Sequence, residues 1–408
     1  MKYGIVSDSH GVEDDNLLRV TSDLIDRGTE MFIHAGDLNV KHKKAELFGD
    51  LPVACALTRD QHPAINPDFV TAPAGWHFTL PAMLEPSRAV ICDEVTRQVL
   101  EKTGIIPEGT SIRQKLSYNN IANRIVIWGK VKIYLGHERS HDVLTARELF
   151  LNFLKDIDQV SDGVTLICTG HTHHAFLVQS GNKTWINPGA VMVLPEIVMP
   201  GDGYSYALYD SSNGEVVFCR IPVVKYDLDP ITVGVIADTD NVATLDNGYW
   251  AKLAREFHER GTSVIIMCGN HWGGDIGRPE LSGFDVHFNI LPHQQSTPSN
   301  VPSNWHRINP EFPIVEINGF KLLVGYDFGM GLSEQEEFGS LTMAADMSKK
   351  YRNHHVDFLL CGQSQDALYE EGDNIAILCP GNSRNRRKFA TICLPRKEIT
   401  FGAIRVAA

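Results

Sequence analysis

Short apolar runs alternate along the chain with longer stretches in which apolar residues recur at helical spacing. Residues 3–8 and 232–238 are two of the apolar runs, and each ends in an aspartate. A stretch with helical spacing follows each of them, over residues 16–27 and 248–260. Runs such as 164–168 are typical of strands covered on both faces. The pattern therefore predicts an α/β fold in which strands alternate with helices.

The same pattern occurs twice. Each of the two predicted helices ends in the tripeptide Arg-Gly-Thr, where glycine suits the left-handed position that follows a helix. Six pairs of segments match in the same order: 27–29 with 260–262, 31–37 with 264–270, 53–61 with 286–294, 132–137 with 321–326, 168–175 with 360–367, and 187–189 with 379–381. Such an ordered set of matches indicates an internal repeat.

The repeat predicts two homologous domains, residues 1–226 and residues 231–408. The separation between matching segments shortens midway, so the first copy carries an extra segment at residues 63–122. A helix is predicted within it, over residues 88–102. This segment is interpreted as a cap beside the site or, equally, as a surface decoration.

Composition narrows the class of protein. The 408 residues are 43% hydrophobic and 21% charged, which is typical of globular proteins and excludes disorder, collagen-like repeats or coiled coil as the main architecture. The net charge of -13 argues against broad binding to nucleic acid or to an anionic membrane surface. No apolar run reaches the roughly 18 residues that a membrane-spanning helix needs.

Two features predict a cytoplasmic protein. The N-terminus enters a strand-like run directly, without the apolar segment of a signal peptide. The eight cysteines are scattered and form no Cys-x-x-Cys pair. Five of them lie in or beside apolar runs: Cys55, Cys168, Cys268, Cys361 and Cys379. We therefore expect reduced, buried thiols rather than disulfides.

In the first copy, aspartate and histidine side chains follow the predicted strands. They belong to Asp8, His10, Asp37, His62, His137, His171 and His173. Loops at the carboxyl ends of strands are where α/β sheets bind ligands. Imidazole and carboxylate together suit Mn, Fe, Zn, Ni or Co, and a carboxylate can bridge two such ions. Each short motif alone is common in loops, but their ordered combination indicates a site for two metals.

The order of these motifs resembles the calcineurin-like metallophosphoesterase family, and within it the small bacterial and archaeal phosphodiesterases. The motifs are Asp-x-His, Gly-Asp, an amide followed by His, Gly-His, Gly-His-x-His and Asn-Pro-Gly. The resemblance covers residues 1–222 apart from 63–122, and residues 231–408 in degenerate form. It implies a four-layer α/β/β/α sandwich, present twice in tandem, with a dinuclear metal site in the first copy.

Carried over to this sequence, the resemblance assigns a role to each residue. The ligands of the first metal would be Asp8, His10 and His173, those of the second His137 and His171, and the bridge Asp37.

One loop departs from the family pattern. Gln61 stands where the family has Asn and would offer its amide oxygen to a metal, with Asp60 as the rival ligand. His62 would be the catalytic general acid, and Arg59 would contact the phosphate.

These roles imply a metal-dependent phosphoesterase, with a phosphodiesterase favoured over a phosphatase for monoesters. Two divalent ions, manganese first among the candidates, would lower the pKa of a bridging water, and the hydroxide would attack phosphorus in line with the leaving oxygen. His62 would protonate that oxygen. The partner is a phosphate-ester substrate, with nucleotides among the candidates, while the acidic charge disfavours long nucleic acid.

The second copy lacks every imidazole of this set. The matching residues are Asp238, Asp240, Asn270, Gln294, Tyr326, Gln363 and Gln365. Because glutamine is a poor ligand for transition metals, we expect this copy to keep the fold without the dinuclear centre. A weak site for a hard cation at Asp238 and Asp240 is the alternative. The Gly-Asn-His at residues 269–271 falls at the Gly-Asp position of the repeat, so its likeness to the family motif is read as coincidental.

A non-catalytic scaffold is the alternative function for the whole chain. The family includes a retromer subunit that lacks activity and works through its surfaces. Because the second domain lacks these imidazoles, a scaffolding role is favoured for it. It would bind either another copy of this chain or a different protein. The complete set of ligands in the first domain favours an enzyme.

Overall fold

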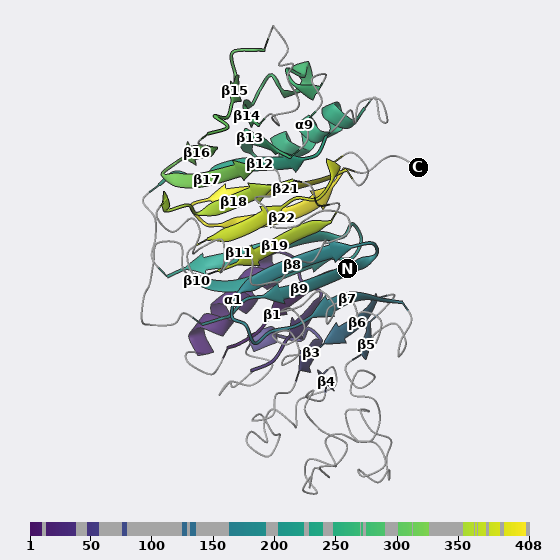
Figure 1. Ribbon diagram of the computed structural model, residues 1–408. Helices are drawn as coiled ribbons and strands as arrows, with labels where there is room; N and C mark the ends of the chain where they lie inside the picture. Colours follow the sequence, from purple (N-terminus) through teal and green to yellow (C-terminus); the bar gives the residue numbers. More distant parts are fainter. Residues whose placement is uncertain are drawn as a thin grey trace, which may run out of the picture. The chain divides into compact units, whose positions relative to one another are not determined.

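Figure 1 shows the computed structural model of the chain. The described residues are 1–9, 14–37, 47–56, 76–79, 125–128, 131–135, 163–192, 203–223, 228–239, 248–269, 271, 275–289, 301–311, 313–325, 354–362, 364, 366–372, 375–383 and 387–404. The predicted helix at 88–102 lies outside them.

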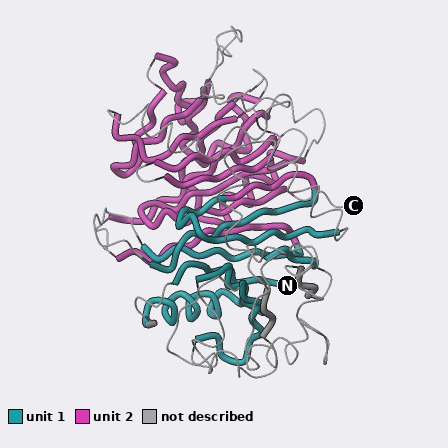
Figure 2. The backbone as a smooth tube through the Cα atoms, turned by 60° about the horizontal axis from the view of Figure 1, so that its bottom comes forward, with its two compact units in different colours: residues 1–176, 182–212 teal, residues 177–181, 213–408 magenta. Residues whose placement is uncertain are grey.

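The chain forms two compact units, which Figure 2 shows in different colours. Unit 1 comprises residues 1–176 and 182–212. Unit 2 comprises residues 177–181 and 213–408. Each unit is built from two groups of paired strands, as described below.

In unit 1, four parallel strands form the first group. They are β1 (Lys2–Val6), β2 (Met31–His34), β3 (Val53–Ala56) and β4 (Trp76–Thr79), paired in this order. Strand β10 (Gly203–Asp210) pairs antiparallel on the other side of β1. Strand β4 lies within the extra segment 63–122, and its four residues pair with β3.

Helix α1 (Asp14–Asp26) confirms the helix predicted over 16–27. Leu17, Val20 and Leu24 are buried against the strands, and Leu18 and Ile25 on the other side are exposed. This division follows from the helical spacing of the apolar residues. The helix contacts β1 and β10 and leads the chain from β1 into β2.

The second group of strands in unit 1 comprises one antiparallel pair and a run of parallel strands. Strand β5 (Ile125–Trp128) pairs antiparallel with β6 (Val131–Leu135). Strands β6, β7 (Val164–Cys168) and β9 (Lys183–Pro188) are parallel neighbours. The loop after β7 and the end of β9 carry the residues of the candidate site.

In unit 2, four parallel strands again form the first group. They are β12 (Ile231–Ala237), β13 (Thr262–Cys268), β14 (Asp285–Phe288) and β15 (Trp305–Arg307). On the other side of β12 follow the antiparallel strands β21 (Lys388–Leu394), β22 (Glu398–Ala403) and β11 (Glu215–Pro222).

The second group of unit 2 also repeats the pairing of unit 1. Strand β16 (Ile314–Ile317) is antiparallel to β17 (Phe320–Gly325), as β5 is to β6. Strands β17, β18 (Phe358–Cys361) and β20 (Ala376–Cys379) are parallel, as β6, β7 and β9 are. Strand β19 (Ala367–Glu371) pairs antiparallel with β20, and β8 (Ala175–Ser180) lies next to β19.

Matching turns also share their backbone conformation. Gly189 and Gly381, from the two Pro-Gly turns, have φ of 79° and 85°. A Cβ on either one would lie within 3.3 Å of a backbone nitrogen, that of Ala175 for Gly189 and that of Ala367 for Gly381. A positive φ together with this close approach requires glycine at both turns.

Helix α9 (Tyr249–Glu259) confirms the helix predicted over 248–260, and it packs on β13. Trp250, Leu253 and Phe257 lie on its buried face, in one apolar cluster with residues of β13, β14 and the 3-10 helix η3 (Pro279–Leu281). This cluster is the core of unit 2 on that side of the sheet.

The described cysteines agree with the expected reduced thiols. Seven are free, and all but Cys393 are buried. Burial raises the pKa of the Cys55 and Cys168 thiols well above the ordinary value. Among the helices of the described residues, none has the length and apolar character to cross a bilayer.

Gly234 of β12 tests how tightly α9 packs on the sheet. A Cβ at this position would lie 2.8 Å from the ring of the fully buried Phe257. We expect Gly234→Ala to lower the free energy of unfolding by about 1–3 kcal/mol, measured by urea denaturation. The matched control is Gly283→Ala, whose Cβ would lie 3.5 Å from its nearest neighbour, the His258 ring. Equal effects of the two substitutions would contradict the packing.

Candidate functional site

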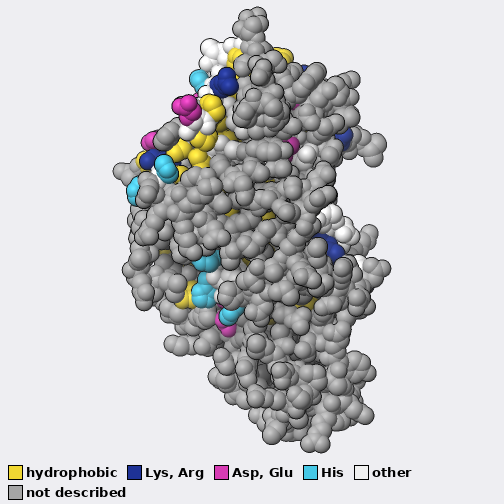
Figure 3. Space-filling view, in the orientation of Figure 1, with side chains coloured by type: hydrophobic (Ala, Val, Ile, Leu, Met, Phe, Trp, Pro, Cys, Tyr) yellow, Lys and Arg dark blue, Asp and Glu magenta, His cyan; other side chains and the backbone are white. Residues whose placement is uncertain are grey.

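Four of the predicted site residues lie among the described residues, each just after a strand of unit 1. Asp8 follows β1, Asp37 follows β2, and His171 and His173 follow β7. The predicted residues His10, Arg59, Asp60, Gln61, His62 and His137 lie outside the described part of the chain. Figure 3 shows histidine side chains at the surface of the face drawn.

All four residues have a left-handed backbone. Their φ angles are 52° for Asp8, 53° for Asp37, 76° for His171 and 60° for His173. Among the described residues only nine that are not glycine have positive φ, and these four are among them. A Cβ makes this conformation costly, by roughly 1–2 kcal/mol per residue. Strained backbone of this kind concentrates at functional sites.

The carboxylate of Asp8 contacts two of the other three residues, His171 and His173. It is fully buried. The backbone N–H of His171 donates to both of its oxygens, at 3.2 and 3.1 Å, and the hydroxyl of Ser7 donates to Oδ2 at 2.5 Å. The Nε2 atom of the partly exposed His173 lies 3.5 Å from Oδ1. Because a buried charge requires partners, these contacts fix the loop after β7 onto the end of β1.

Asn187 holds the same loop from the other side. Its buried amide donates to the carbonyl of Gly170 at 3.1 Å and to the hydroxyl of Thr172 at 2.9 Å, while its Oδ1 accepts from the backbone N–H of Gly189 at 3.0 Å. The Ser7 hydroxyl oxygen also lies 2.7 Å from the carbonyl oxygen of Gly189. The sequence indicated no role for Ser7, and the Asn-Pro-Gly segment was noted as one of the family motifs. The asparagine that precedes Pro-Gly was the only feature of the sequence that could have indicated this role of Asn187.

The end of β2 is attached to the end of β1 by a second set of contacts. The backbone N–H of Asp8 donates to the carbonyl of Gly36 at 3.0 Å. The hydroxyl of Ser9 donates to the carbonyl of Asp37 at 3.2 Å and lies 3.4 Å from Nε2 of the buried His34. Asp37 is therefore placed beside Asp8 by the backbone, and His34 supports the strand ends.

The donor types suit a divalent metal, but the described part of the site is incomplete. Within the described residues, no group of three or more His, Cys, Asp or Glu side chains is arranged to hold a metal ion. The remaining predicted ligands lie outside those residues. Asp8 and His173 lie 3.5 Å apart, and they are two of the three ligands, with His10, that the family resemblance implies for the first metal.

In unit 2, Asp238 occupies the position that matches Asp8. It is almost fully buried and its φ is 49°, so the left-handed turn is kept. A Cβ on Gly269 would lie 2.3 Å from Oδ1 of Asp238, which shows how closely the backbone surrounds this carboxylate. The other matching residues, Asp240, Asn270, Gln294, Tyr326, Gln363 and Gln365, lie outside the described part.

A buried polar network lies beside Asp238. The hydroxyl of Thr239 donates to Oδ2 of Asp275 at 3.1 Å and lies 2.9 Å from Nδ1 of His271. Since the hydroxyl proton goes to Asp275, we assign the imidazole proton to Nδ1. The Nε2 atom of His271 is buried without a partner among the described residues. Burial lowers the pKa of His271 to about 4, against the opposing effect of the Met267 and Cys268 carbonyls.

Comparisons with solved structures find phosphoesterases, at low similarity. An archaeal phosphodiesterase has 15% identity and a TM-score of 0.33 over 54% of this chain and 100% of its own. YfcE, a phosphoesterase from E. coli, has 18% identity and a TM-score of 0.27 over 54% of this chain and 93% of its own. Vps29 from Entamoeba histolytica, complexed with Zn²⁺, has 15% identity and a TM-score of 0.30 over 55% and 94%. No protein-family profile and no curated protein matches the chain.

The buried His271 makes the stability of unit 2 depend on pH. Its folded pKa of about 4 is below the ordinary 6.5, so its contribution to stability is complete above pH 6.5 and is lost as the pH falls toward 4. We expect the wild-type protein to lose on the order of 3 kcal/mol more than His271→Gln over this interval, measured by urea denaturation. The exposed His258, replaced by Gln, is the control and should leave the wild-type slope unchanged. A wild-type slope in His271→Gln would contradict the assignment.

Proposed function

We propose that the chain is a metal-dependent phosphoesterase that acts in the cytoplasm, with a phosphodiester as the favoured substrate. Two divalent ions, manganese first among the candidates, would be held by Asp8, His10, Asp37, Gln61, His137, His171 and His173.

One observation carries this proposal. The four described residues of the set all have the left-handed backbone, and two of them, His171 and His173, contact the buried Asp8 carboxylate. A merely structural turn would use glycine or asparagine at such positions, since these residues adopt positive φ at lower cost. Retaining aspartate and histidine there favours a role for their side chains.

In the proposed hydrolysis, some residues orient the metal ligands and others contact the substrate. Bound divalent ions would supply charge neutralisation on the phosphate oxygens and a water of lowered pKa. Ser7 and the His171 N–H orient the Asp8 carboxylate, and Asn187 keeps the loop of His171 and His173 in place. His62 donates a proton to the leaving oxygen, and Arg59 binds the phosphate.

The second half of the proposal is that the chain is a tandem duplication, with a first domain at 1–226 and a degenerate second domain at 231–408. The matching order and direction of strand pairing in the two units support it, as do the matching glycine turns. Unit 2 keeps the left-handed aspartate at residue 238. In this proposal the second domain carries no dinuclear centre and serves as a scaffold.

The phosphoesterase proposal is tested by metal removal and by loss of a carboxylate. Chelator is expected to abolish hydrolysis of a chromogenic phosphodiester and Mn²⁺ to restore it. Asp8→Asn and Asp37→Asn should each lower kcat/KM by at least about 100-fold, because each removes a metal-binding charge. Asp26→Asn, on the exposed side of α1, is the matched control and should keep the wild-type value. Activity that survives chelator or both site substitutions would rule out the proposed centre.

A scaffold without activity is the second candidate, and the replacement of every imidazole of the ligand set in the second copy favours it. Metal content separates the two functions. Protein loaded with Mn²⁺ and freed of excess is expected to hold about two ions per chain if it is the enzyme. Asp37→Asn should reduce that number, as measured by mass spectrometry of the metal. A content near zero in the wild type would favour the scaffold.

A further inference from the structure

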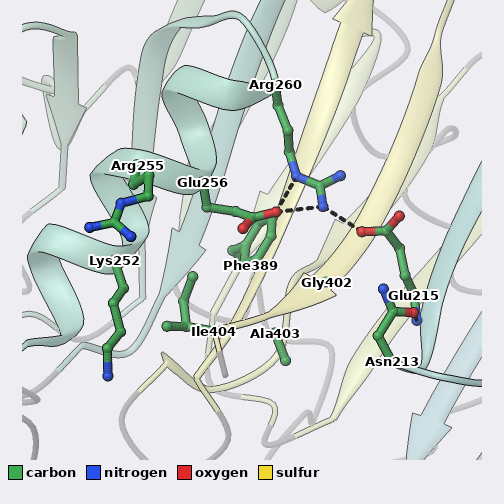
Figure 4. A pocket seen from close by; sticks show the side chains of 10 residues that line it. All are labelled: Asn213, Glu215, Lys252, Arg255, Glu256, Arg260, Phe389, Gly402, Ala403 and Ile404. Carbon is green, nitrogen blue, oxygen red and sulfur yellow. Dashed lines mark hydrogen bonds and ion pairs between the residues drawn. The ribbon is translucent and has the colours of Figure 1, made fainter. Parts of the chain in front are cut away.

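Unit 2 contains a cavity that lies outside the site described above. Its volume is about 240 Å³, and it lies beside helix α9, where β11 and β21 begin and β22 ends. Figure 4 shows Lys252 and Arg255 of the helix on one side of it and Glu215 on the other. The cavity is smaller than those that hold drug-sized ligands, so it suits a small molecule.

Arg260 forms one wall of the cavity and is held rigidly. Its guanidinium donates to Glu256 at 2.8 and 2.6 Å and forms a further short ion pair with Glu215 (Figure 4). It also lies over the ring of Phe389, 5.2 Å from the centroid. Arg260 therefore engages both carboxylates that line the cavity, and it ties the end of α9 to the start of β11.

Lys252 and Arg255 give the cavity an excess of positive charge. Three cations and two carboxylates line it, and Arg260 engages both carboxylates. Arg255 is exposed and makes no ion pair within the described residues. Lys252 and Arg255 are three positions apart on α9, so they are neighbours on the same face of the helix. In a chain of net charge -13, this is a local site of the sign that attracts anions.

The floor of the cavity is apolar and fixed in shape. Phe389 is buried against Gly402, where a Cβ would lie 2.6 Å from the ring, and it meets Phe257 edge-on at 5.5 Å. Ile404 is buried beside it, and Ala403 is exposed at the rim. The cavity thus combines an apolar floor with a cationic wall, which is the combination that small-molecule sites use for affinity and orientation.

We propose that this cavity binds a small organic anion, with its charged oxygen group at Lys252 and Arg255 and its apolar part on the Phe389–Ile404 floor. The charged group is a phosphate monoester or a carboxylate, since both present oxygens that arginine binds through paired hydrogen bonds.

Calorimetric titration of the full-length protein tests this site. The probes are phenyl phosphate and phenylacetate, with phenol as the uncharged counterpart. Chelator and an Asp8→Asn background remove phosphate binding by the proposed metal site of unit 1. We expect at least one of the two anions to bind and phenol not to bind. Binding of phenyl phosphate alone identifies a phosphate ligand, and binding of phenylacetate alone a carboxylate ligand.

Two substitutions locate the binding. Arg255→Ser removes the exposed guanidinium and should weaken the bound anion about tenfold. Ala403→Trp fills the cavity from its exposed rim and should abolish binding without disturbing the core. Arg307→Ser removes an exposed arginine elsewhere in unit 2 and is the control, expected to bind as the parent protein does. The proposal is overturned if neither anion binds, if phenol binds as tightly as they do, or if both cavity variants bind like the parent.

Discussion

The arrangement of the candidate site depends on the need to provide partners for one buried carboxylate. Asp8 is fully buried, and an ionised group in that environment is costly unless donors surround it. Its donors come from its own strand end, through Ser7, and from the loop after β7, through the N–H of His171. Satisfying this one group therefore aligns segments more than 160 residues apart in the chain.

Unit 2 also has a left-handed aspartate after its first strand, with different polar residues beside it. Asp238 has the same burial and left-handed backbone as Asp8. Beside it, Thr239, His271 and Asp275 form a network of hydrogen bonds in a dry interior. In unit 1 the equivalent region holds Ser9 and His34. The two units thus share a scaffold whose polar contents differ.

The elements and the positions of the site residues were predictable, but the contacts that orient those residues were not. Helices α1 and α9 follow from strong local periodicity, and Asp8, Asp37 and His171 follow from their places after apolar runs. The roles of Ser7 and Asn187 depend on hydrogen bonds to residues that only the tertiary fold brings near. Strand β4 was hidden in the 63–122 segment because a four-residue strand has too little periodicity to be recognised. The ion pairs of Arg260 likewise join a helix end to a distant strand, and no local pattern indicates them.

The division of the chain between the two units determines which fragments could fold separately. Strand β11 belongs to unit 2 and pairs with β22, although it precedes the junction that the internal repeat indicates. Residues 177–181, which include most of strand β8, belong to unit 2 as well. A fragment ending at residue 226 would carry β11 away from its partner, and a fragment starting at residue 231 would leave β22 with a bare, hydrogen-bonding edge. Cutting the polypeptide at any single position therefore leaves one unit without some of its residues.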